Sequence, residues 1–278
     1  MISPYCNILI EKGLAYKPLY SSKLSNHLPM SLVALDKMSA NEAIQKSYFD
    51  HSIKRLVKSE NNQLIITHIN DALGQAEYFE AYYNYYFDKL EEESVKKFVT
   101  ESISILIKGI SASAFHAFIR LSYALETCNK KEIVYALAYW SSEYNELATN
   151  SKYTKNSLPE IINQINPISQ NHEFSSGIII DRMNEINSIL KVSKIAIQSK
   201  GLNLDEIRTL CLDIFSTNNN FTILHCITAC HAFRSISEYF SNYPEAISYL
   251  WETIIVAYLS TKLEFKSINI ERKKTGKI

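Results

Sequence analysis

The chain has 278 residues, of which 29 are basic and 29 acidic, so its formal net charge is zero. A neutral chain has no electrostatic attraction for nucleic acid or for an anionic membrane, and we expect neither as a partner. Hydrophobic residues make up 46% of the sequence, which is enough for a sizeable core. A chain of this length can form one large domain or two small ones.

The cysteines and the N-terminus both favour a reduced, cytoplasmic protein. Five scattered cysteines do not form a disulfide framework. No run of 18 apolar residues exists, and the opening MISPYCNILIEKG lacks the charged and apolar regions of a signal peptide. We therefore expect a cytoplasmic chain without a membrane partner.

The scarcity of glycine and proline, six of each, favours long helices. Residues 1–23 are expected to be irregular, because Pro4, Gly13 and Pro18 interrupt any period. Asn26 is the expected N-cap of a helix with Pro29 in its first turn. The further predicted helices cover 41–58, 91–108, 109–127, 131–148, a short segment between Pro159 and Pro167, 178–198, 204–215, 222–240 and 244–263.

The predicted architecture is one all-α domain over residues 1–278. No alternating strand pattern persists, and no linker rich in Gly, Pro or Ser marks a boundary. The polar stretch 149–159 is the best candidate for a split, but histidines of interest lie on both sides of it. The basic tail, residues 271–278, is expected to be frayed.

Four of the seven histidines lie among apolar residues: His27, His116, His225 and His231. A buried imidazole must find a partner for each ring nitrogen. Any one of these histidines alone is at least as well explained as a core residue bonded to a backbone carbonyl. Four in one chain favour a shared metal ion, because imidazole is the commonest neutral ligand.

The spacing of His225 and His231 argues against a simple helical pair. Residues six apart on an ideal helix are separated by about 9 Å and about 120°. Both could bind one metal only if the helix is irregular, or if it starts late, after Asn218–Asn220. Their role depends on the other two histidines.

Other polar side chains near these histidines could be either functional or structural. Cys226 and Cys230 share a helix face and could bind zinc with a histidine, but free cysteines are more often small buried hydrophobes. Arg120 and Arg234 follow His116 and His231 within one turn. Each arginine could orient a carboxylate, bind an anionic oxygen of a substrate, or pair with Asp or Glu on a neighbouring helix, which is the commonest role. The segments AFHAFIR and ACHAFR are similar, either because two helices are arranged pseudo-symmetrically around one centre or by chance.

Four phrases resemble the questin oxidase-like family: SNHLPMSLVALDKMSA (25–40), SAFHAFIRLSYALE (113–126), EIVYALAYW (132–140) and FTILHCITACHAF (221–233). They occur in family order over most of the chain. Fungal members oxidatively open anthraquinone-type rings, and at least one resembles a mononuclear non-haem iron dioxygenase with four histidines and a carboxylated lysine. The resemblance implies His27, His116, His225 and His231 as iron ligands. No phrase fixes the lysine, and Lys262 in AYLSTKLEF is the candidate.

The leading hypothesis is therefore an iron(II) oxygenase that uses O₂ to oxygenate or cleave a quinone- or polyketide-like ring. Its small aromatic substrate would lie in a pocket lined by Tyr and Phe, and Arg120 or Arg234 would steady phenolate charge. One alternative is a non-catalytic helical scaffold whose histidines serve only packing. Another is a zinc-binding, hydrolase-like protein that uses Cys226 and Cys230.

Overall fold

The computed structural model describes residues 2–60, 63–147, 152–193 and 195–265 of the chain. Over these ranges the chain forms twelve α-helices, four short 3-10 turns and two two-stranded sheets, which confirms the all-α prediction. The helices are α1 (Pro4–Gly13), α2 (Leu28–Lys37), α3 (Glu42–Ser52), α4 (Phe79–Glu92), α5 (Val95–Leu106), α6 (His116–Thr127), α7 (Lys130–Ser142), α8 (Leu158–Gln170), α9 (Ile179–Ser193), α10 (Leu204–Asn218), α11 (Phe221–Ser235) and α12 (Tyr243–Leu259).

The strands are only two residues long. β1 (Leu19–Tyr20) pairs antiparallel with β2 (Leu24–Ser25), and β3 (Tyr153–Thr154) pairs in parallel with β4 (Gln198–Ser199). The 3-10 turns are η1 (Ile53–Arg55), η2 (Ala76–Tyr78), η3 (Ile107–Gly109) and η4 (Ser237–Tyr239). No helix among the described residues is both long enough and apolar enough to cross a membrane.

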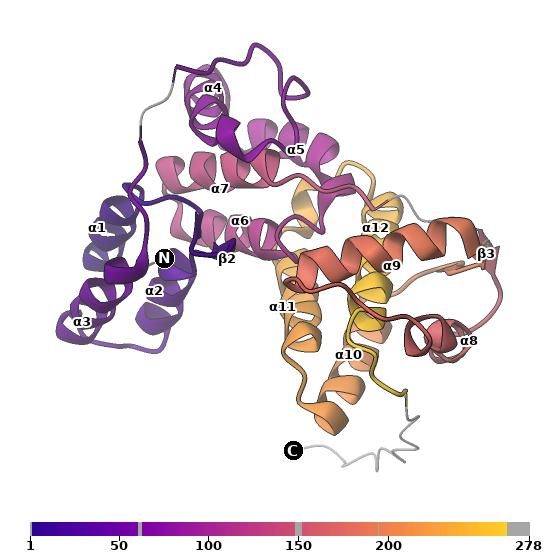
Figure 1. Cartoon of the computed structure of the whole chain (residues 1–278). Helices are drawn as coiled ribbons and strands as arrows, with labels where there is room; N and C mark the ends of the chain where they lie inside the picture. The colour runs from indigo at the N-terminus through magenta and orange to yellow at the C-terminus, as the bar shows by residue number, and fades with distance from the viewer. Residues whose placement is uncertain (1, 61–62, 148–151, 194, 266–278) are drawn as a thin grey trace, which may run out of the picture.

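Helices α6 and α7 run through the middle of the molecule, between two groups of helices (Figure 1). On one side α1, α2 and α3 pack around a small hydrophobic cluster of their own. On the other side lie α8 to α12, which share the larger cluster with α4 to α7. Helix α6 contacts both α2 and α11, so elements far apart in the sequence meet at α6.

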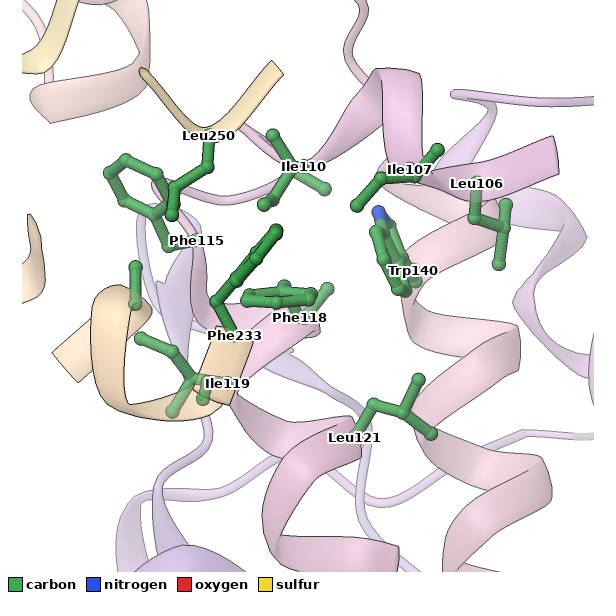
Figure 2. Packing of buried hydrophobic residues seen from close by; sticks show 14 of the residues in the cluster. Leu106, Ile107, Ile110, Phe115, Phe118, Ile119, Leu121, Trp140, Phe233 and Leu250 are labelled. Atoms are coloured by element: carbon green, nitrogen blue, oxygen red, sulfur yellow. The ribbon is translucent and has the colours of Figure 1, made fainter. Parts of the chain in front are cut away.

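Aromatic side chains lock α6, α7 and α11 together (Figure 2). The ring of Phe118 lies 5.4 Å from that of Trp140 and 6.4 Å from that of Phe233, measured between centroids. Trp140 donates its Nε1 hydrogen to the carbonyl of Gly109 at 2.8 Å. Large buried rings contribute much of a core's stability, so this cluster holds the three helices in a fixed relation.

The prediction of an irregular segment over residues 1–23 is wrong, because Pro4 begins helix α1 instead of breaking it. Proline suits the first helical position, where its missing N–H would have no partner. Ser3 caps the helix by accepting from the backbone N–H of Cys6. Asp36 of α2 accepts from both the backbone and the hydroxyl of Ser3, which ties the two helices together.

Several other helix boundaries also differ from the prediction, and three of them have a clear local reason. Glu91 and Glu92 are the last two residues of α4 instead of opening α5, whose N-cap is Ser94. Helix α8 continues through Pro167, close to its C-terminal end. Helix α6 begins only at His116, because the residues before it have left-handed backbone angles. Residues 271–278 lie outside the described part of the chain.

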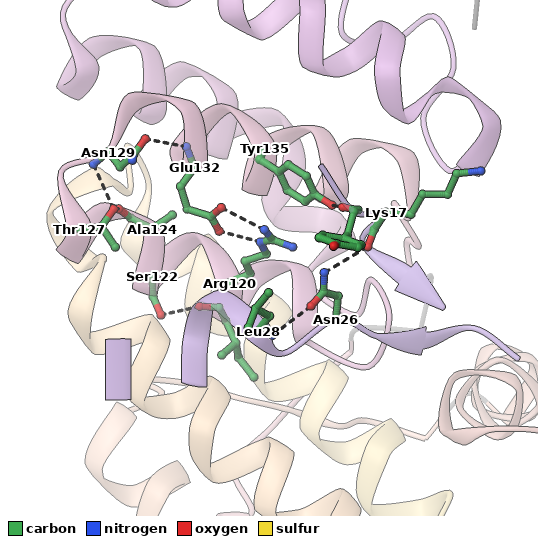
Figure 3. Close-up of polar contacts among 12 residues, drawn as sticks. Lys17, Asn26, Leu28, Arg120, Ser122, Ala124, Thr127, Asn129, Glu132 and Tyr135 are labelled. Carbon is green, nitrogen blue, oxygen red and sulfur yellow. Dashed lines mark hydrogen bonds and ion pairs between the residues drawn. The ribbon is translucent and has the colours of Figure 1, made fainter. Parts of the chain in front are cut away.

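A buried ion pair joins α6 to α7 (Figure 3). Arg120 donates from Nε to Oε1 of Glu132 at 2.8 Å and from Nη2 to Oε2 at 3.0 Å. Both side chains are only 1% exposed, and the guanidinium lies 3.8 Å from the centroid of the Tyr135 ring. Planar, bidentate geometry of this kind is specific to arginine, and the pair fixes how the two helices lie against each other.

Arg120→Ala is expected to lower the free energy of unfolding by about 3–5 kcal/mol, because it leaves the Glu132 carboxylate buried without its partner. Urea denaturation followed by circular dichroism measures this loss. Arg234→Ala is the matched control, because its ion pair with Asp205 is half-exposed and should contribute less than about 1 kcal/mol. Equal losses in the two variants would contradict the structural role of Arg120.

Candidate metal centre

Three of the four predicted histidines meet at one point. Nε2 of His116 lies 2.9 Å from Nε2 of His27 and 3.1 Å from Nε2 of His225. The ligand atoms of all three lie within 4.8 Å of one another, and no other such group of His, Cys, Asp or Glu occurs among the described residues. The three imidazoles come from the beginnings of α2, α6 and α11.

Helix capping places His27 and His225. His27 immediately precedes α2, where the side chain of Asn26 accepts from the N–H of Leu28 at 3.0 Å. The cap residue is therefore one position later than predicted, although Asn26 does supply the hydrogen bond. Asn219 ends α10 in a left-handed conformation and Asn220 caps α11, so His225 falls in the second turn of α11.

A strained turn places His116. Ser113, Ala114 and Phe115 have φ values of 47°, 53° and 72°, which form one left-handed turn directly before α6. Each such residue costs roughly 1–2 kcal/mol when it carries a side chain. The fully buried ring of Phe115 anchors the turn in the core (Figure 2). Strain of this kind persists only where the surrounding structure holds it, and it concentrates at functional sites.

Hydrogen bonds to backbone carbonyls fix the tautomers of two rings. Nδ1 of His116 lies 2.5 Å from the carbonyl oxygen of Ser113, and Nδ1 of His225 lies 2.7 Å from that of Phe221. A carbonyl oxygen only accepts, so both Nδ1 atoms must carry hydrogen. In a neutral ring Nε2 then carries the lone pair. Two lone pairs thus face each other at 3.1 Å with no hydrogen between them.

A proton does not relieve this contact at neutral pH. Burial, with the neighbouring His225 and His27 rings, lowers the pKa of His116 to about 3. Burial also lowers the pKa values of His225 and His27. The neutral rings suit a metal cation, which binds imidazole lone pairs at about 2.0–2.1 Å in zinc sites and so brings neighbouring nitrogens to within about 3–3.5 Å of each other.

His231 is not part of this group. It is exposed on α11, and the helix is regular from Phe221 to Ser235. His231 therefore lies about 9 Å further along the axis and about 120° around it from His225. The late helix start did occur, but it placed His225 in a normal turn instead of bringing the two rings together.

The other predicted site residues lie elsewhere. Arg120 is in the buried pair with Glu132, and Arg234 pairs with Asp205 on the surface. Lys262 donates to the backbone carbonyl of His172 at 2.8 Å and does not belong to the histidine group. All three side chains therefore have partners outside the group formed by His27, His116 and His225.

The cysteines form a separate buried cluster. Cys226 and Cys230 are fully buried on α11, and both contact Cys211 of α10. The hydrogen bond with the Cys211 thiol, together with burial, raises the pKa of Cys230 far above its ordinary value. Thiols held neutral in this way fill space between two helices, which agrees with the expectation of small buried hydrophobes.

A cavity of about 590 Å³ opens beside the histidines, within the range usual for small-molecule sites. We call it the histidine cavity. His27 and His116 line it, and His225 contacts both His116 and Phe221 at its edge. The other lining residues include Lys23, Ser113, Glu143, Tyr144, Ile178, Ile179, Ile180 and Phe221.

Sequence reasoning missed most of this lining. Glu143 and Tyr144 directly follow α7, in a stretch predicted to be helical up to residue 148. Phe221 is 63% exposed. It precedes the histidines and cysteines of α11, and its own pattern in the sequence did not predict a role in binding. The apolar run Ile178–Ile180 after the loop 171–176 was the one available signal of a binding surface.

A comparison with protein families matches most of the chain. The family model described as "Questin oxidase-like" matches residues 24–276, which covers all three clustered histidines. No curated protein matches the chain in sequence. The description of the family indicates an oxidoreductase with a small-molecule substrate. Because the match spans nearly the whole length, the chain belongs to the questin oxidase-like family.

Proposed function

We propose that this protein is an iron(II)-dependent oxygenase that uses O₂ to oxidise a small aromatic, quinone- or polyketide-like molecule. The observation that carries the proposal is the pair of facing Nε2 lone pairs on His116 and His225, with His27 beside them. Three neutral nitrogen ligands at this spacing suit a divalent first-row metal.

The choice of iron over zinc rests on the family. Imidazole ligands alone do not identify the metal, because they suit zinc, copper, iron and nickel. Zinc has no redox chemistry, and the family is described as oxidase-like. Iron(II) bound by the three histidines would supply the one-electron chemistry that lets dioxygen react with a closed-shell aromatic ring.

The chain itself supplies the binding surface for a flat aromatic molecule. The Phe221 ring is exposed at the edge of the histidine cavity and lies against His225, with ring centroids 4.5 Å apart. Ile178, Ile179 and Ile180 add apolar surface. A planar ring stacked on Phe221 would lie next to the imidazole cluster, where oxidation is proposed.

The alternative functions have less support. Histidines that served only packing would gain nothing from the facing Nε2 lone pairs of His116 and His225, because neither nitrogen can donate a hydrogen bond to the other. A zinc–thiolate site would need Cys226 or Cys230 near a histidine, whereas these thiols contact Cys211. The observations therefore favour a histidine-bound metal.

Protein purified without chelator is expected to carry close to one iron per chain. His116→Ala should lose most of this metal, since it removes the central ligand, whereas His231→Ala should retain it. Elemental analysis of the three proteins measures the difference. Absence of metal from the unaltered protein, or equal loss in both variants, would argue against the proposed centre.

Iron-loaded protein is expected to consume O₂ when given a hydroxylated tricyclic quinone or its hydroquinone. An oxygen electrode and mass spectrometry of the products measure turnover and oxygen incorporation. His116→Ala should show at most about 1% of the rate, because the redox centre is missing. Equal uptake by the variant and the unaltered protein would show that the histidine cluster is not the site of reaction.

Phe221→Ala is expected to weaken binding of planar aromatic ligands about tenfold, which corresponds to the roughly 1–1.5 kcal/mol of an aromatic pair. Its effect on stability should be small because the ring is largely exposed. Fluorescence titration gives the Kd. Tyr153→Ala, another exposed aromatic outside the histidine cavity, is the control and should bind normally.

A further inference from the structure

Glu143 lies between two cavities. It follows the last residue of α7 and lines the histidine cavity together with His27 and His116. It also lines a second cavity of about 430 Å³, whose other ionisable residues are Lys17, Glu60, Glu77 and Glu80. We call this the carboxylate cavity. The Glu143 carboxyl group therefore faces the histidine cavity on one side and further carboxylates on the other.

Ser113 links Glu143 to the metal centre without direct contact between the two. The Ser113 hydroxyl donates to Oε2 of Glu143 at 3.2 Å, while the Ser113 carbonyl accepts from Nδ1 of His116. Glu143 is not a member of the histidine group. One residue of the strained turn therefore fixes both a metal ligand and a carboxyl group beside the same cavity.

The surroundings of Glu143 favour a carboxylate that accepts protons readily. Partial burial raises its pKa, and the hydrogen bond from Ser113 and the Lys23 ammonium oppose that rise. A carboxylate with a raised pKa is a stronger base than one with the ordinary pKa, and the rate of general-base catalysis rises with base strength.

We propose that Glu143 accepts the phenolic proton of the aromatic substrate in the histidine cavity. The phenol O–H bond breaks, the proton moves to a carboxylate oxygen of Glu143, and the phenolate oxygen keeps the electron pair. No electron is transferred in this step, and the electron-rich phenolate is the form that reacts with an oxidant. The proton then leaves through the carboxylate cavity. This inference rests on the proposed function, because it requires a phenolic substrate.

The test compares the binding of 2-hydroxyanthraquinone with that of its O-methyl ether, which cannot donate a hydrogen bond. The unaltered protein should bind the phenol about tenfold more tightly than the ether, because a hydrogen bond to a charged acceptor is strong. In Glu143→Gln this preference should fall to about twofold. Glu101→Gln, an exposed carboxylate on α5, should keep the full preference.

The preference for the phenol over its ether should increase with pH. A raised pKa means that Glu143 is ionised only above that pKa, so the preference is present at higher pH and is lost as pH falls through it. Groups that face Glu143 are Lys23, Tyr139 and the ionisable residues of the carboxylate cavity. Lys23→Met removes the opposing ammonium and should move the midpoint to higher pH.

These measurements separate the role of Glu143 from that of the metal. Binding is measured on the protein as purified and again after chelator treatment, and iron is determined in each sample. The phenol preference should persist in both, even if the iron proposal fails. Equal affinities for phenol and ether in the unaltered protein, no binding of either, or an unchanged preference in Glu143→Gln would overturn the proposal.

Discussion

The candidate site depends on two hydrogen bonds that fix which nitrogen of the His116 and His225 rings carries hydrogen. Because Ser113 and Phe221 offer carbonyl oxygens, the Nδ1 atoms of His116 and His225 must donate. The remaining nitrogens then present lone pairs to each other, and burial disfavours the proton that would otherwise separate them. Metal-binding histidines are generally oriented in this way, through a backbone or carboxylate partner on the other nitrogen.

The rest of the fold serves to bring these carbonyls and rings together. The carbonyl of Phe221 faces His225 because Asn220 caps α11, so the helix begins at Phe221, four residues before the histidine. The carbonyl of Ser113 faces His116 because three consecutive residues adopt a left-handed turn. The aromatic core around Phe118 and the buried Arg120–Glu132 pair hold α6 against α7 and α11. Strain at residues 113–115 is thus compensated by packing that lies one helical turn away.

The sequence predicted the helical class and three of the histidines, since both are expressed in local patterns. Helical periodicity and the few glycines identify the helices, and apolar neighbours mark the imidazoles. The left-handed turn had no such signal, because Ser-Ala-Phe contains neither glycine nor asparagine. Pro4 was misread because proline signals both the interruption and the first turn of a helix. Glu143 was missed because it enters the site only when α7 ends beside the turn before α6.

The likeness of AFHAFIR and ACHAFR shows why similar phrases need not have similar roles. In the first phrase the histidine opens a helix, so its ring projects from the helix end toward α2 and α11. In the second phrase His231 lies within α11, on an exposed face. The arginines diverge for the same reason: Arg120 faces the neighbouring helix α7, whereas Arg234 faces solvent. Position relative to the helix end decides which histidine can share a metal, and no repeat of residue letters encodes that position.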